Sequence, residues 1–252
     1  MTLRLRNTFL ISLAAVAVIG LLFSARLIML HEGLSLDYII DQLPLIIMNI
    51  FTSVACIIIF FSFRNTSSSE IFFFYIYIFS FMFDIFRYSD LLTEIFPVFT
   101  TYAMAATRLV YYGRFVGALA LFSAGLFTTG LEYGRMRITL ILTVILPAAL
   151  VLVLPVDVTS HVAGGTWEIG KFHEITISLS ILHIIAVLNF LIAAMKNESG
   201  DYSIIAISLF AAICGREMIF YFNGIFPIIG MVLMLAGTIS FGLRLHRLYL
   251  WD

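Results

Sequence analysis

Charged residues are scarce in this sequence. Asp, Glu, Lys and Arg make up 12% of its 252 residues, whereas they make up roughly a quarter of an ordinary soluble domain. The 14 basic and 15 acidic side chains are too few to cover a soluble protein of this size, and 62% of all residues are hydrophobic. The composition excludes a water-soluble fold and predicts an all-α polytopic membrane protein in contact with the lipid bilayer. The net charge of −1 provides no basic field for nucleic acid.

Cysteine is equally rare, and the pattern of possible metal ligands is sparse. The two cysteines, Cys56 and Cys214, lie in apolar runs and form neither a disulfide framework nor a CxxC motif. A zinc site needs three or four converging ligands, and His161, His173 and Glu174 match no such spacing. We therefore expect no metal and no cofactor.

Eight apolar segments are long enough to cross a bilayer core of about 30 Å, which takes about 20 residues per helix. They cover residues 8–30, 44–63, 71–92, 98–130, 138–154, 175–195, 202–222 and 227–245. We predict one transmembrane domain over 1–252, in which 1–43 form an anchor helix with a short outer loop and 44–252 form a seven-helix bundle. A signal peptide is the alternative for the first segment, but Phe23 occupies a cleavage position that prefers a small residue.

Basic residues near the ends of these segments predict the orientation, because Lys and Arg are retained on the cytoplasmic side. With the N-terminus inside, the cytoplasmic set is Arg4, Arg6, Arg64, Arg135, Arg137, Lys196, Arg244 and Arg247. Only Lys171 and, at the margin, Arg26 fall outside. An even number of spans brings the C-terminus inside as well. The sequence thus predicts a multi-pass inner-membrane protein whose longer outer segments are 31–43 and 156–171.

Several charged residues lie inside the predicted spans, where each unpaired one costs roughly 2.5–3.5 kcal/mol. They are Asp84, Arg87, Arg108, Arg114, Arg216 and Glu217, and His183 lies near the middle of the sixth span. Arg87, Arg108, Arg216 and His183 fall at a similar depth in the outer half of the membrane. We hypothesise an outward-open cavity in which three arginines face Asp84 and Glu217 and bind an anionic small molecule or a lipid headgroup. The alternative is that these charges only bridge helices.

The fourth predicted span carries two further features. Arg114 lies about 240° around the helix from Arg108, so we expect it to face elsewhere, toward an oligomer contact or a deeper ion pair. Gly113 and Gly117 form a GxxxG motif that permits close helix approach. Packing within the chain is the favoured reading of this motif, and dimerisation is the alternative.

The sequence gives weaker indications of an enzyme or a transporter than of a binding cavity. Ser180 precedes His183 by one turn, but an intramembrane hydrolase also needs a group that orients the base. Asp84, Glu217 and His183 are residue types that proton relays use, yet no inverted repeat accompanies them. A proton- or ion-coupled transporter or channel subunit is therefore the second hypothesis, and an intramembrane lipid-acting enzyme is less favoured.

From Pro44 onward the chain resembles the seven-helix membrane module of bacterial receptors of the 7TMR-DISM type. The likeness is carried by a polar break and aromatic entry, from Phe63-Arg64-Asn65 through Phe72-Phe73-Phe74-Tyr75-Ile76-Tyr77, and by the last helix from Gly237 to Arg247. The resemblance implies a receptor-like function, although the outer domain of such receptors is reduced here to 31–43 and no signalling domain follows Asp252. We expect a non-catalytic receptor-like or accessory module that couples to a membrane or cytoplasmic protein.

The C-terminal segment is the candidate for that coupling. Its basic residues Arg244 and Arg247 are expected at anionic headgroups, with Tyr249 and Trp251 beside them. One reading is a membrane anchor for the helix end. The other is a docking handle for the partner, since aromatic and arginine side chains are common interface hot spots.

Overall fold

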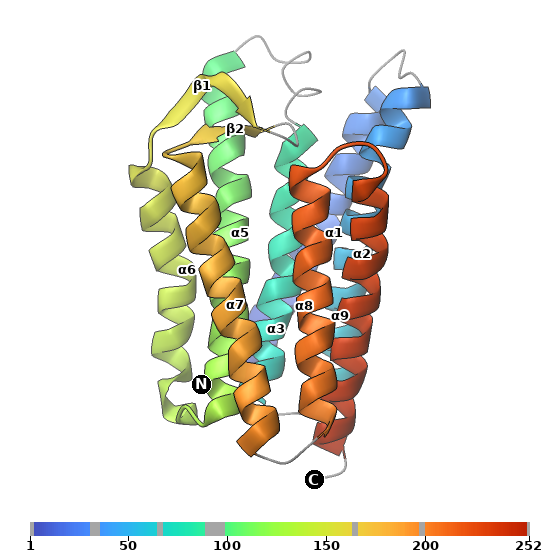
Figure 1. The fold of residues 1–252 in the computed structure, drawn as a ribbon. Coiled ribbons are helices and arrows are strands. Elements are labelled where there is room, and N and C mark those ends of the chain that lie inside the picture. The colour runs from blue at the N-terminus through green and yellow to red at the C-terminus, as the bar shows by residue number, and fades with distance from the viewer. Residues whose placement is uncertain are drawn as a thin grey trace.

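The computed structural model describes residues 3–30, 36–64, 68–88, 99–162, 166–196 and 200–250. These residues form a bundle of long, roughly parallel and antiparallel helices with a β-hairpin at one end (Figure 1). Eight helical segments are long and apolar enough to cross a membrane. The predicted multi-pass helical membrane fold is therefore confirmed, and the hairpin is the one departure from an all-α structure within the described residues.

Most elements begin and end within a few residues of the predicted bounds. In chain order they are α1 Leu3–Leu30, α2 Leu36–Phe63, α3 Ser69–Ser80, the 3-10 helix η1 Phe81–Tyr88, α5 Phe99–Thr129, the 3-10 turn η2 Tyr133–Arg135, α6 Met136–Val153, β1 Val156–Val162, β2 Thr166–Ile169, α7 Phe172–Lys196, α8 Gly200–Tyr221 and α9 Phe226–Leu250. The largest shift is in α2, which begins at Leu36 rather than 44 and includes Pro44.

The third span is not the single α-helix that we predicted over 71–92. Ser68 begins α3 as its N-cap, with its hydroxyl accepting the Ile71 N–H at 3.3 Å, and the α-helix ends at Ser80. The chain continues as the tighter 3-10 helix η1. Almost all of α3 is buried, because α3 and α5 lie in the middle of the bundle. The sequence of a segment that is apolar on almost all sides does not indicate where an α-helix changes to a 3-10 helix.

The segment 156–171, which we predicted as an extramembrane loop, contains the antiparallel strand pair β1–β2. The strands are rich in Val, Thr, Trp and Ile, which favour extended backbone. The Trp167 N–H donates to Thr107 Oγ1 at 3.1 Å, and this bond ties the hairpin to the end of α5. The hairpin lies at the end of the bundle opposite to both chain termini (Figure 1).

Glycines allow the closest helix contacts. A Cβ atom at Gly113 would lie 2.4 Å from Phe83 Cβ, so the GxxxG motif packs against η1 within the chain, as predicted. A Cβ at Gly215 of α8 would lie 2.4 Å from the Gly230 carbonyl of α9, a contact that the sequence pattern did not predict.

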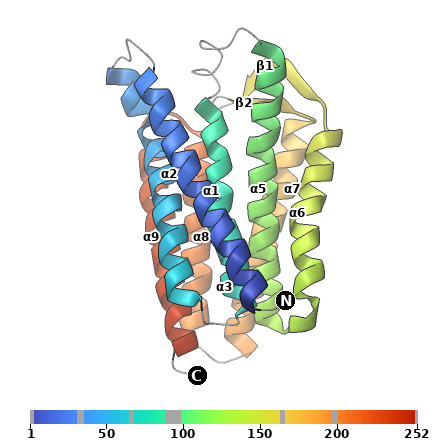
Figure 2. The same ribbon diagram turned by 180° about the vertical axis from the view of Figure 1, so that it is seen from behind.

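On the opposite side of the bundle from the view of Figure 1, α1 crosses in front of α2 and α3 (Figure 2).

Candidate functional site

A group of charged side chains fills the bundle interior near the ends of η1 and α8, and we name it the polar core. Its members are Asp84, Arg87, Arg114, His183, Arg216 and Glu217, from η1, α5, α7 and α8. All but Glu217 are buried. Residues from four elements therefore meet at one charged centre inside a bundle of largely apolar helices.

Arg216 and Asp84 form the inner ion pair. The guanidinium Nη2 of Arg216 lies 3.2 Å from Asp84 Oδ2, and Nη1 donates to Ser80 Oγ at 3.1 Å. Gly117 of α5 makes space for this contact, because a Cβ there would lie 2.7 Å from Arg216 Nη1 and 2.5 Å from Ser80 Oγ. The end of α3, the start of η1 and the close approach of α5 thus form one socket for a single arginine.

Arg87 caps the C-terminal end of α8. Its Nη2 donates to the Ile219 carbonyl at 3.2 Å, one of the last carbonyls of α8, which have no partner within the helix. A cation is favourable there because the helix dipole is negative at its C-terminus. Two guanidinium groups lie over the Phe220 ring, that of Arg87 at 5.0 Å and that of Arg114 at 3.7 Å from the ring centroid.

Glu217 and Arg114 form the second ion pair. Arg114 Nη2 lies 2.5 Å from Glu217 Oε2 and donates to the Tyr221 hydroxyl at 3.1 Å. The other carboxylate oxygen of Glu217, Oε1, lies 3.8 Å from His183 Nδ1 of α7. Thr176, two turns earlier on α7, lies 3.3 Å from the Tyr221 hydroxyl. This half of the polar core joins α5, α7 and α8.

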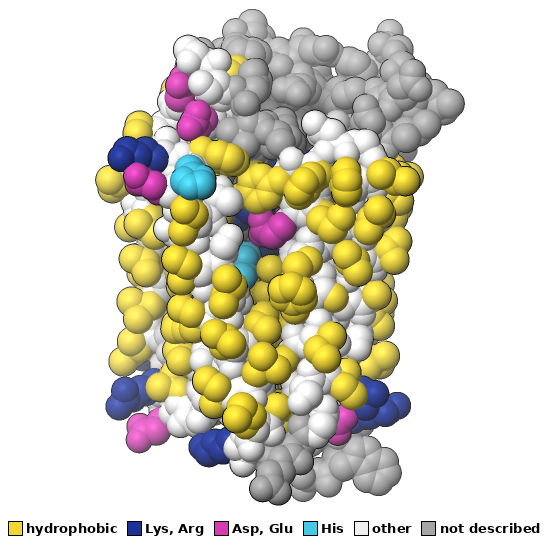
Figure 3. Space-filling view, in the orientation of Figure 1, with side chains coloured by type: hydrophobic (Ala, Val, Ile, Leu, Met, Phe, Trp, Pro, Cys, Tyr) yellow, Lys and Arg dark blue, Asp and Glu magenta, His cyan; other side chains and the backbone are white. Residues whose placement is uncertain are grey.

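The second ion pair opens sideways between α7 and α8. The side chain of Glu217 is 26% exposed, whereas those of Arg114 and His183 are 2% and 8% exposed. Figure 3 shows an acidic and a histidine side chain recessed within the yellow apolar band over these helices. We call this opening the lateral notch, with Glu217 at its mouth and His183 and Arg114 behind it. A carboxylate is therefore reachable from the apolar side of the bundle.

The structure places the two arginines of α5, Arg108 and Arg114, differently from the predicted cavity. Arg114, which we expected to face away from the charged centre, is the partner of Glu217, consistent with the deeper ion pair that remained open. Arg108 instead lines a small cavity between α5 and α6 with Tyr112 and Ala148. Because α5 contacts α3, α6 and α7, side chains on several of its faces meet protein. The polar core still holds three arginines and two carboxylates, but Arg114 takes the place that we predicted for Arg108.

Other predicted residues are also placed differently. Ser180 is exposed, and its hydroxyl donates to the Thr176 carbonyl at 2.9 Å rather than to His183. Arg244 forms an ion pair with Asp201 at 2.9 Å, so its charge is already matched within the protein. Arg247 is exposed, while Trp251 and the side chain of Tyr249 lie outside the described residues.

The polar core retains hydrogen-bonding capacity. Among the described residues, no partner is found for His183 Nε2, Arg114 Nε and Nη1, or Arg216 Nε. No group of three His, Cys, Asp or Glu side chains suited to a metal ion occurs in that part of the chain. The lateral notch can therefore accept a hydrogen bond at the Glu217 carboxylate and donate hydrogen bonds from Arg114.

Comparison with known proteins assigns no family. No protein-family model matches the chain, and neither a curated protein nor a solved structure is similar to it. The resemblance to receptors of the 7TMR-DISM type thus depends on the sequence features alone.

Proposed function

We propose that this protein is a non-catalytic, receptor-like or accessory module of the inner membrane, with both termini in the cytoplasm. In this proposal the lateral notch binds a polar group of a ligand or of a membrane partner. The observation that supports it is the partial exposure of Glu217, whose partners Arg114 and His183 are buried. A purely structural ion pair gains nothing from an exposed edge within the apolar belt, because a charge facing lipid is costly.

A photoreactive side chain at Ser180 tests this function in cells. Ser180 is exposed on α7, one turn from both Thr176 and His183. We expect a discrete cross-linked adduct at this position that the Glu217→Gln substitution reduces. The matched control is the same photoreactive side chain at Leu152, which is 68% exposed on α6. The proposal fails if the adducts at Ser180 and Leu152 are the same, or if Glu217→Gln leaves the Ser180 adduct unchanged.

Proton- or ion-coupled transport is the second candidate function. It is favoured by the 3.8 Å separation of Glu217 Oε1 and His183 Nδ1, which a proton could bridge after a small movement. Ion-driven uptake into liposomes distinguishes the two functions. A receptor-like module shows no flux above empty liposomes, whereas a carrier shows flux that Glu217→Gln abolishes and the distant Arg137→Gln preserves.

A further inference from the structure

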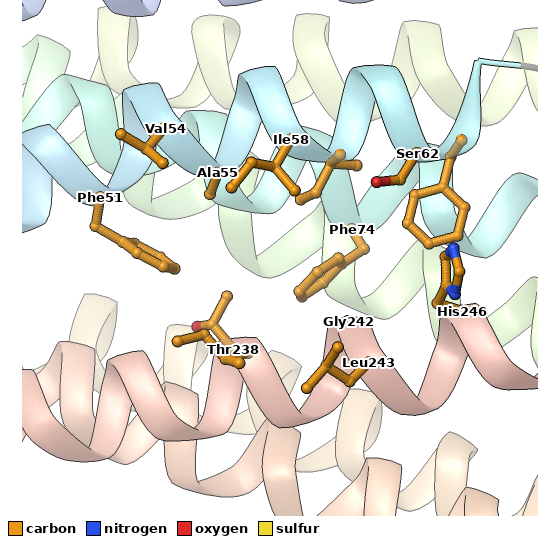
Figure 4. A pocket seen from close by; sticks show the side chains of 13 residues that line it. Phe51, Val54, Ala55, Ile58, Ser62, Phe74, Thr238, Gly242, Leu243 and His246 are labelled. Atoms are coloured by element: carbon orange, nitrogen blue, oxygen red, sulfur yellow. The ribbon is translucent and has the colours of Figure 1, made fainter.

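An apolar groove runs along the outside of the bundle between α2 and α9 (Figure 4). Its volume is about 540 Å³. Phe51 and Thr238 face each other toward one end, Ser62 and His246 lie at the other, and Phe74 of α3 lies between the two helices (Figure 4). The groove includes no member of the polar core, so it is a separate feature of the molecule.

The dimensions of the groove match an acyl chain. The twelve residue steps from Phe51 to Phe63 correspond to about 18 Å of α2, slightly more than half of a bilayer core of about 30 Å. A volume of about 540 Å³ over that length gives a mean cross-section of about 30 Å². The groove therefore fits one extended chain within a single leaflet.

Two arginines flank the mouth of the groove at the end of the bundle that holds both termini. His246 lines it, with its ring 5.1 Å from that of Phe63. On α9, Arg247 continues the row of Ile239 and Leu243 at a spacing of four residues, and Arg64 follows Phe63 directly. Arg64 and Arg247 are both exposed. No acidic side chain occurs among the described residues that line the groove.

We infer that this groove binds an anionic phospholipid, with one acyl chain between α2 and α9 and the phosphate at the basic mouth. The apolar walls accept the acyl chain of any lipid, so selection comes from the headgroup. Guanidinium groups donate charge-assisted hydrogen bonds to phosphate oxygens. Basic side chains near the membrane surface attract anionic lipids in the same way.

Competition between two lipids tests the inference. The purified protein is incubated with equal amounts of phosphatidylglycerol and phosphatidylcholine of identical acyl chains, and retained lipid is measured by native mass spectrometry. We expect preferential retention of one phosphatidylglycerol. Gly242→Leu should abolish it, since a Cβ at Gly242 meets no atom within 4 Å and the larger side chain fills the groove. Arg247→Gln should weaken retention about fivefold through loss of one basic charge.

Two variants serve as controls. Ala149→Leu adds the same side chain to the exposed face of α6, and Arg137→Gln removes an exposed arginine at the same end of the bundle. Both should retain phosphatidylglycerol as the wild type does. Equal retention of the two lipids by the wild type, or retention by Gly242→Leu equal to that of Ala149→Leu, would overturn the inference.

A second measurement uses only the wild-type protein and does not depend on the folding of a variant. Phosphatidylglycerol with a photoreactive acyl chain is cross-linked in vesicles, and the adducts are mapped by peptide sequencing. The inference predicts that adducts concentrate in 51–63 and 238–246. Adducts distributed evenly over all lipid-facing helices would show ordinary bilayer contact and would overturn it.

Discussion

Each of the two carboxylates in the polar core pairs with one arginine, which explains how these charges persist inside the bundle. Asp84 pairs with Arg216 and Glu217 pairs with Arg114, while Arg87 donates to the end of α8. Such pairs add little net stability, because desolvation of both ions offsets their attraction. Removing one member, however, leaves an uncompensated charge. The polar core therefore determines which helices meet rather than how strongly the bundle holds together.

Arg114→Gln tests this pairing. The substitution leaves the Glu217 carboxylate without its guanidinium, and we expect a loss of about 3–5 kcal/mol in unfolding free energy. Denaturant unfolding in detergent measures the effect. The double variant Arg114→Met with Glu217→Gln removes both charges and should recover most of the loss. For comparison, Arg135→Gln breaks an exposed pair with Glu132 at 3.7 Å and should cost no more than about 1 kcal/mol. Similar costs for Arg114→Gln and Arg135→Gln would contradict the pairing.

Gly117→Ala tests the socket of Arg216. The new methyl group would lie 2.5 Å from Ser80 Oγ and 2.7 Å from Arg216 Nη1, so either the helices or the arginine must move. We expect a destabilisation of about 1–3 kcal/mol, the usual range for overpacking. Gly134→Ala is the control, because a Cβ there meets nothing within 4 Å. Equal melting temperatures for the two variants would show that Gly117 is not required for close packing.

The sequence predicts the positions of the helices, but not the directions of the side chains on the central ones. The eight spans could be located because each needs about 20 consecutive apolar residues, whether its side chains face lipid or the interior of the bundle. The direction of a side chain on a central helix could not be resolved, because α5 contacts α3, α6 and α7. Arg108 and Arg114 both point into protein, and only the packing of α8 decides that Arg114 meets Glu217.

A local cluster of hydrogen bonds surrounds Asp157 on the first strand of the β-hairpin. Its carboxylate accepts the Thr159 N–H at 2.8 Å and the Thr159 hydroxyl at 2.6 Å, with Ser160 Oγ at 3.3 Å. These bonds, first that of the Thr159 hydroxyl, hold the pKa of Asp157 below its ordinary value of 3.8. A lowered pKa in the folded state means that the stabilisation is present above the ordinary value and is lost as the pH falls through the lowered one.

Acidification should therefore loosen the hairpin below about pH 4. Trp167 is the reporter, since it is buried and its N–H bonds to Thr107 at 3.1 Å. In a Trp251→Phe background, we expect its emission to shift toward that of exposed tryptophan below this pH and to stay constant above it. Asp157→Asn should remove most of the pH dependence. An identical acid transition in Asp157→Asn would exclude Asp157 as its origin.

The complete bundle has both termini at one end and the hairpin at the other (Figures 1 and 2). Arg6 of α1 donates to the carbonyls of Phe63 and Arg64 at 3.2 and 3.1 Å, which joins the start of α1 to the end of α2. Basic residues near that end led us to propose that it is cytoplasmic. The structure has no membrane, so this orientation stays a prediction.

Cysteine accessibility in intact cells tests the orientation. Ser160→Cys in the hairpin should react with a membrane-impermeant thiol reagent added outside. Gly134→Cys, in the exposed turn between α5 and α6, should react only after permeabilisation. The native thiols are expected to contribute little, since Cys56 is buried and both cysteines lie within spans. The reverse pattern of labelling would invert the proposed topology.

Accessibility of Glu217 from the bilayer is the property on which the proposed function depends most. An apolar carbodiimide partitions into membranes and modifies the carboxyl groups that it reaches there. In mildly acidic vesicles we expect it to modify Glu217, which is 26% exposed, and to spare Asp84, which is 3% exposed and paired with Arg216. Peptide mapping identifies the modified residue. Absence of modification at Glu217, or equal modification of Asp84, would contradict the lateral notch.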